Sequence, residues 1–83
     1  MVEFSDFSEA SLRKAFPDNA NRLKWRAAVR LHIGLREAED RSVLLDVDLG
    51  ADLFLLQLGD ARVLWELRPD GGKTIWKVTH RRR

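Results

Sequence analysis

"FLLQLGDARVLWELRPDGGKTIWKV", residues 54–78, consists of three apolar runs separated by two turn sequences. Gly59-Asp60 is typical of a two-residue hairpin turn, and residues 69–72, Pro-Asp-Gly-Gly, are typical of a four-residue hairpin loop. Within the runs apolar and polar residues alternate with a period of two, as in strands that are buried on one face. The stretch therefore predicts an antiparallel meander.

The turn lengths also predict the register, and with it two different sheet faces. The turn places Leu58 opposite Ala61, and the four-residue loop places Trp65 opposite Trp76. One face is then wholly apolar and is the predicted core: Phe54, Leu56, Leu58, Val63, Trp65, Leu67, Trp76 and Val78. The other face is apolar at one end and basic at the other: Leu53, Leu55, Gln57, Arg62, Leu64, Glu66, Ile75, Lys77, Thr79 and Arg81.

Two interpretations of this second face are open. In the simpler one, the leucines lie under a connecting segment and the basic residues are solvated. In the other, the face is a half-apolar surface with an arginine cluster, suited to an acidic or phosphate-bearing partner.

The N-terminal half predicts helical structure, with one ambiguous segment. Asp6-Phe7-Ser8-Glu9 has the form of a capping box, and Pro17 ends the helix expected over about residues 7–16. Residues 22–37 have the composition of a helix, but their apolar residues occupy every second position, as in a strand. The segment is therefore either a second helix or a fifth strand. The predicted fold is α+β, a single domain over residues 1–83, with one or two N-terminal helices on a curved antiparallel sheet of four to five strands.

Composition excludes several kinds of protein. The 83 residues contain no cysteine, and His32 and His80 stand far apart, so neither a metal site nor a cofactor is expected. No apolar run approaches the ~20 residues of a membrane span, and acids stand where a signal peptide carries lysines, which predicts a soluble, cytoplasmic protein. The net charge is only +2, but residues 61–83 carry seven bases against two acids and predict a basic patch.

Residues 52–83 resemble the RelE/ParE superfamily, the toxins of bacterial toxin–antitoxin pairs. Members have a strand, a short turn ending before an arginine, a strand of the form Arg-Val-Leu-Tyr-Glu, a hairpin, and a last strand closing with Val-Gly-His-Arg-Arg or similar. The counterparts here are "RVLWEL" at 62–67 and "VTHRR" at 78–82. Residues 2–16 look like the opening strand and first helix of the family, and 19–38 like its second helix.

The resemblance implies a metal-independent endoribonuclease that cuts messenger RNA on the ribosome. In such members the sheet face orients RNA, assists attack of a ribose 2′-hydroxyl on the adjacent phosphate, and stabilises the developing charge. Arg62 and Arg81 match the phosphate-stabilising arginines, and His80 matches a residue that serves in proton transfer; these three are the expected catalytic residues. The expected RNA- or phosphate-binding residues are Lys77, Arg82, Arg83 and Gln57.

The sequence also departs from the family pattern. Leu55 and Gln57 stand where many members have Glu and Arg, Ala61 replaces a tyrosine, and acids at 46, 48 and 52 replace lysines. The predicted active site is therefore eroded, and members that poison gyrase lack the nuclease set as well.

The departures leave an alternative function, a non-catalytic module that binds protein. The partner expected from the resemblance is a small antitoxin-like protein, with the ribosome and messenger RNA as further partners. The expected partner-binding residues are Leu53, Leu55, Leu64 and Ile75. A third hypothesis is nonspecific nucleic-acid binding through Lys77 and the C-terminal arginines.

Overall fold

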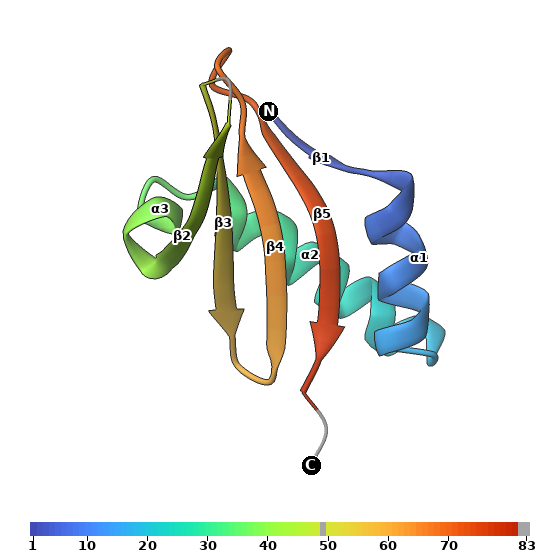
Figure 1. Ribbon diagram of the computed structural model, residues 1–83. Coiled ribbons are helices and arrows are strands. Elements are labelled where there is room, and N and C mark those ends of the chain that lie inside the picture. Colours follow the sequence, from blue (N-terminus) through green and yellow to red (C-terminus); the bar gives the residue numbers. More distant parts are fainter. Residues whose placement is uncertain (49, 82–83) are drawn as a thin grey trace.

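The computed structural model describes residues 1–48 and 50–81, with Asp48 described by its backbone only. Five strands form one sheet and helices pack against it (Figure 1), which confirms the predicted α+β class. The elements in chain order are β1 (Val2–Phe4), α1 (Asp6–Ala15), α2 (Asn19–Gly34), α3 (Ala38–Arg41), β2 (Ser42–Asp48), β3 (Ala51–Leu58), β4 (Ala61–Leu67) and β5 (Lys73–His80).

The sheet has the strand order β1-β5-β4-β3-β2. Strands β2 to β5 form the predicted antiparallel meander, whereas β1 pairs with β5 in parallel. The sheet is therefore mixed, and the prediction of a wholly antiparallel sheet is wrong at this edge. The helices and the meander separate β1 from β5 in sequence, so the two strands can meet in parallel, which a tight hairpin does not allow.

The register between β3 and β4 agrees with the prediction. Leu58 lies opposite Ala61 and Phe54 opposite Trp65, so the turn has two residues. Gly59 has a φ of 58°, which favours glycine at this position.

The register between β4 and β5 agrees with the prediction at one end only. Val63 lies opposite Val78 as expected, but Leu67 lies opposite Lys73. The hairpin loop is shorter than predicted, because the N–H of Arg68 donates to the carbonyl of Gly72 (2.8 Å) and Gly71 has a φ of 85°. The shorter loop adds one residue to β5, and a β-bulge in that strand accommodates it.

The bulge exchanges the predicted positions of two large side chains. Trp65 lies opposite Ile75, and Trp76 is the additional residue. Ile75 is 0% exposed and Trp76 is 39% exposed. The placement of Trp76 in the core and of Ile75 on the other face is therefore wrong, because the sequence does not indicate the bulge.

Residues 22–37 form most of helix α2, so the strand alternative is wrong. The Asp18 carboxylate accepts a hydrogen bond from the N–H of Asn21 (2.9 Å) and caps the helix. Apolar residues at every second position include a set spaced by four, Trp25, Val29 and Ile33, which packs against the core. The remaining set, Leu23, Ala27, Leu31 and Leu35, is exposed. The alternation thus contains a helical face with a period of four.

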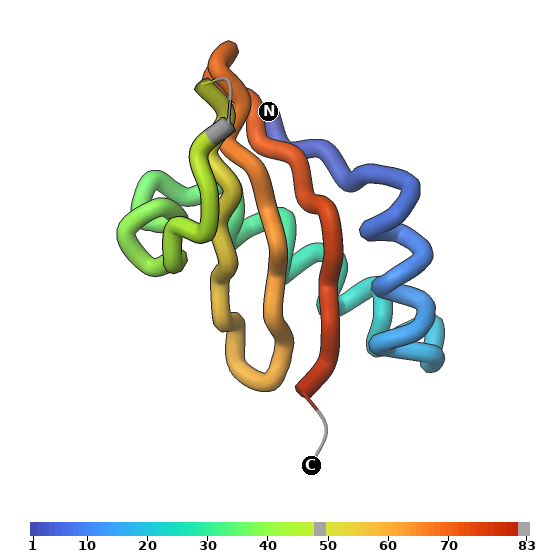
Figure 2. Tube along the Cα trace, viewed as in Figure 1, coloured from blue at the N-terminus to red at the C-terminus, as the bar shows by residue number. Residues whose placement is uncertain are grey.

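Helix α1 begins one residue earlier than predicted. The hydroxyl oxygen of Ser5, not Asp6, caps it by accepting the N–H of Ser8 (3.0 Å). Figure 2 shows α1 beside the half of β5 that β1 does not reach. The hydroxyl of Ser11 there accepts the N–H of Val78 (2.9 Å), so α1 satisfies part of the β5 edge.

The core lies between the helices and one face of the sheet. Trp65 is its largest fully buried side chain; its ring stacks on Phe54 with centroids 4.6 Å apart, and its indole N–H donates to the hydroxyl of Ser42 (2.9 Å). The other buried apolar residues are Leu12, Phe16, Val29, Ile33, Ala38, Leu56, Ala61, Val63, Ile75 and Val78. No helix in the described part of the chain has the length and apolarity to cross a membrane.

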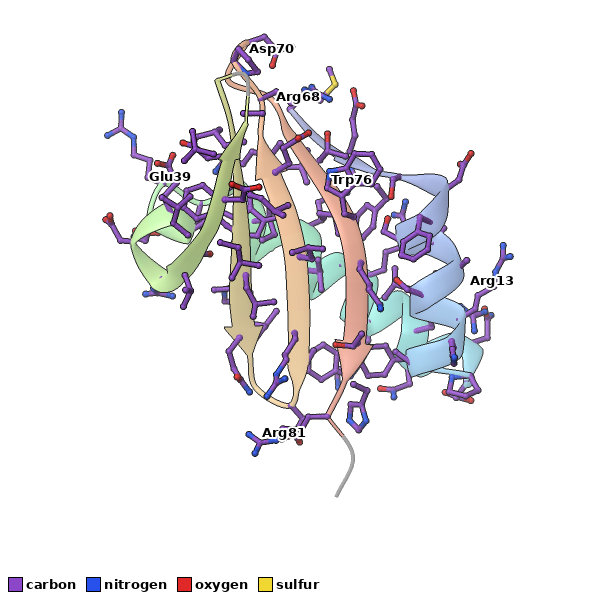
Figure 3. The ribbon with its side chains drawn as sticks, in the orientation of Figure 1. Arg13, Glu39, Arg68, Asp70, Trp76 and Arg81 are labelled. Atoms are coloured by element: carbon purple, nitrogen blue, oxygen red, sulfur yellow. The ribbon has the colours of Figure 1, made fainter. Side chains whose placement is uncertain are left out.

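Replacing Ser11 with alanine tests how α1 is held on the sheet. We expect Ser11→Ala to lower the free energy of unfolding by about 1–3 kcal/mol, because the N–H of Val78 loses its partner. Urea unfolding measures the difference. Arg13→Ala on the same helix, whose side chain points into solvent (Figure 3), is the control and should be neutral. Equal stability of Ser11→Ala and wild type would contradict this account of the β5 edge.

Candidate nucleic-acid interface on the open sheet face

We use "open face" for the side of the sheet opposite α2. In Figure 1, α2 crosses behind the sheet and α1 lies beside β5, so the described helices leave this side uncovered. Strand pairing places on the open face Glu3, Val43, Asp46, Leu53, Leu55, Gln57, Arg62, Leu64, Glu66, Thr74, Lys77 and Thr79. The unpaired bulge residue Trp76 also lies on this side.

Basic and polar side chains gather near the Gly59-Asp60 turn. Arg62 lies opposite both Gln57 and Thr79, on its two neighbouring strands. The N–H of Arg81 donates to the carbonyl of Asp60 (2.7 Å), and the strand alternation puts Arg81 next to Thr79 on the same side. We call this cluster the arginine end: Gln57, Arg62, Lys77, Thr79 and Arg81.

The two arginines of the arginine end are close enough to share one anion. Arg81 is the diagonal neighbour of Arg62 across the β4–β5 pair, and such positions lie about 7–8 Å apart. Both side chains are long and exposed. Two guanidinium groups at this spacing can donate charge-assisted hydrogen bonds to the same phosphate.

In the described part of the chain, the cations of the arginine end form no contact ion pair with an acid. The ion pairs among residues 1–48 and 50–81 are Arg26–Glu9, Arg68–Glu3 and Arg68–Asp70, and the arginine end takes part in none of them. Gln57 is held by its own turn, since its amide donates to the carbonyl of Gly59 (3.1 Å). The positive charge of this end is therefore available to a bound anion.

Arg68, by contrast, is occupied by partners in β1, in its hairpin loop and in β5. Its guanidinium donates to Glu3 (3.2 Å), Asp70 (3.3 Å) and the hydroxyl of Thr74 (3.1 Å). The N–H of Gly72 and the guanidinium of Arg68 both lower the pKa of Asp70. The hydrogen bonds that Arg68 donates to Glu3 and Asp70 raise its own pKa. Its charge stabilises the loop and is not free for a ligand.

His80 does not join the two arginines on the open face. It lies opposite Ala61, on the core side of the sheet, and the edge of its ring meets Phe16 with centroids 5.3 Å apart. There it borders a groove of about 470 Å³ between α1 and β5, together with Ser11, Lys14, Ala15, Lys77, Val78 and Thr79. The expected catalytic set of Arg62, Arg81 and His80 is therefore not assembled on one face.

The expected partner-binding residues are only partly placed as predicted. Leu53, Leu55 and Leu64 lie half-buried on the open face, whereas Ile75 is buried in the core and cannot contact a partner. Arg82 and Arg83 lie outside the described residues. The sequence reasoning also missed Trp76 and the apolar residues that β2 exposes at the sheet edge: Val43, Leu44, Leu45 and Val47.

The open face can bind a phosphate but offers little acid–base chemistry. Glu66 is four residues from Arg62 along β4, about 13 Å, too far to take a proton beside the same phosphate. No group of three or more His, Asp or Glu side chains in the described ranges could hold a metal ion.

Comparison with known proteins places the fold. No protein-family model and no curated protein matches the chain. Two of the solved structures that match this chain have a TM-score of 0.68. One is a chain of the archaeal RelE–RelB complex from Pyrococcus horikoshii OT3, with 19% identity over 99% of this chain and 94% of that chain. The other is a chain of the toxin–antitoxin complex RelBE2 from Mycobacterium tuberculosis, with 24% identity over 98% of this chain and 96% of that chain.

The chain has the RelE fold. At these identities the likeness establishes the fold, and it covers the helices as well as residues 52–83, where the sequence resemblance is strongest. The likeness therefore covers the strands that form the open face.

The pH dependence of stability tests how Arg68 is engaged. The pKa of Asp70 is lowered in the folded chain, so its charge stabilises the fold above the unfolded pKa of about 3.9 and ceases to do so as pH falls through the lower folded value. We expect Asp70→Asn to unfold at lower urea concentration than wild type at pH 7, and the difference to shrink towards pH 3. A difference that does not change with pH would contradict the assigned ion pair.

Proposed function

We propose that this chain is a RelE-like toxin whose open face binds messenger RNA on the ribosome. The observation that carries the proposal is the placement of Arg62 and Arg81 as diagonal neighbours on an uncovered sheet face, with no acid paired to either among the described residues. The RelE fold supports it, because both similar structures are toxin–antitoxin complexes.

The arginine end would act on the phosphate that follows an attacked ribose. Attack of a 2′-hydroxyl adds negative charge to the phosphate oxygens, and the two guanidinium groups would stabilise that charge. The proton of the 2′-hydroxyl has no acceptor nearby in the described chain, since Glu66 is distant and His80 lies on the other side of the sheet. We therefore propose RNA binding with slow cleavage: the 2′-oxygen bonds to phosphorus, the bond from phosphorus to the 5′-oxygen of the next nucleotide breaks, and solvent water takes the 2′-hydroxyl proton and protonates the leaving 5′-oxygen.

We also propose a small antitoxin-like protein as the cellular partner. Each of the two similar structures contains a toxin with its antitoxin. Strand β2 leaves one edge of the sheet unpaired in the described chain and exposes four apolar side chains there, a surface that a protein segment can cover. These exposed side chains also favour the second candidate function, a non-catalytic module that only binds protein.

Expression in bacteria tests the toxin proposal. We expect the wild type to arrest growth and the double variant Arg62→Ala/Arg81→Ala to be harmless, because the phosphate loses both guanidinium groups. The control is Arg13→Ala/Arg36→Ala, which removes the same charge from exposed helix and loop positions and should stay toxic. Toxicity that survives in the Arg62/Arg81 variant would contradict the proposal.

Binding of a single-stranded oligoribonucleotide gives an independent readout. Each phosphate that loses its neutralising cations reduces the slope of log Kd against log salt by about 0.7. Because the two arginines bind the same phosphate, the double variant should have a slope smaller by about 0.7. The control variant should keep the wild-type slope. A pull-down that returns one small partner, with no RNA binding by the wild type, would favour the protein-binding module instead.

A further inference from the structure

Trp76 is placed differently from the other two tryptophans. The ring of Trp65 is fully buried against Phe54, and the ring of Trp25 stacks on Phe16 with centroids 4.9 Å apart. Trp76 is 39% exposed and takes part in none of the aromatic contacts found in the described chain. A large aromatic side chain that the core does not use needs another explanation.

The bulge in β5 puts Trp76 on the open face. Leu64 of β4 faces Lys77, and its neighbour Trp65 faces Ile75, so Trp76 is the unpaired residue between them. Ile75, which precedes Trp76, is buried, whereas Lys77, which follows it, is exposed. Trp76 and Lys77 therefore lie on the same side of the sheet. Figure 3 shows Trp76 beside the upper half of β5, with Arg81 at the lower end of that strand.

Trp76 lies close to the arginine end along β5. Trp76 precedes Thr79, the neighbour of Arg62, by three residues, or about 10 Å along the strand. A few nucleotides of a single strand span this separation. A phosphate bound at the arginine end would therefore leave a nearby base of the same strand within reach of the indole.

We propose that Trp76 is a base-stacking residue for single-stranded RNA. An unpaired base stacks on the indole, while Lys77 and the two arginines of the arginine end hold the flanking phosphates. Aromatic rings beside a cationic groove are the usual means by which proteins bind single strands without reading sequence. The inference rests on the proposed function. It adds that an unpaired base of the RNA stacks on Trp76.

Two properties of the substrate follow from stacking. Every base has a flat face, so recognition by Trp76 tolerates any sequence. Bases inside a duplex are already stacked on one another, so the indole has access only to unpaired ones. The open face should therefore prefer single-stranded RNA to duplex RNA of the same length.

Binding of a fluorescein-labelled adenosine 12-mer tests the inference. We expect Trp76→Leu to weaken binding about fivefold to a hundredfold, as the loss of one stacked base does, and Trp76→Phe to restore most of the affinity. Because no charge is lost, the salt slope of Trp76→Leu should equal that of wild type, unlike that of Arg62→Ala/Arg81→Ala. The matched control is Phe7→Leu, which replaces an exposed aromatic residue on α1, away from the open face. This variant should bind the 12-mer as wild type does.

The outcomes separate this inference from the proposed function. If the wild type does not bind the 12-mer, both fail. If the wild type binds and Trp76→Leu binds equally well, only the role of Trp76 is overturned. If Trp76→Leu keeps RNA affinity but loses a co-purified protein partner, Trp76 belongs to a protein-docking surface and the inference is wrong. An equal loss in Phe7→Leu would also overturn it, because the effect would then not be specific to Trp76.

Discussion

One additional residue in β5 determines what each face of the sheet presents. The short hairpin loop shifts the pairing of Leu67, and the bulge at Trp76 restores it before Val78. Ile75 consequently fills the space beside Trp65 in the core, and Trp76 stays outside. The shift ends within β5. The halves of β4 and β5 next to the Gly59-Asp60 turn therefore keep the register that makes Arg62 and Arg81 diagonal neighbours.

The helices then decide which face a ligand can reach. α2 covers one side through Trp25, Val29 and Ile33, and α1 covers the free edge of β5 through the hydroxyl of Ser11. The opposite side keeps unpaired cations near one end and half-buried leucines in the middle. Exposed cations contribute little to stability, so this arrangement is better explained by binding than by folding.

Much of this fold follows from local sequence signals. The turn at Gly59, the register of β3 with β4 and the open-face position of Arg62 all agree with expectation, because turn length and a period of two fix them together. The helix α2 was ambiguous, since alternate apolar residues also satisfy a spacing of four. Tertiary packing, which the sequence pattern does not contain, selects the helix.

The positions of the candidate site residues were predicted in part, where strand alternation holds, and were wrong at the bulge. Strand alternation placed Arg62 and Arg81 together and already tilted His80 towards the core side, where the structure finds it. It could not place Trp76 or Ile75, because a bulge has no strong sequence signal and one extra residue reverses the faces. The exposed edge of β2 depends on the order of the strands in the sheet. The residue pattern within one β-strand does not indicate that order.

The central claim is that RNA binds the open face at the arginine end. Titration of the isotope-labelled chain with a single-stranded oligoribonucleotide, followed by amide NMR shifts, tests it most directly. We predict that the largest shifts fall on Gln57, Arg62, Lys77, Thr79 and Arg81 and extend to Trp76. Shifts confined to α2 or to the β2 edge, with no shifts in the halves of β4 and β5 next to the Gly59-Asp60 turn, would contradict the claim.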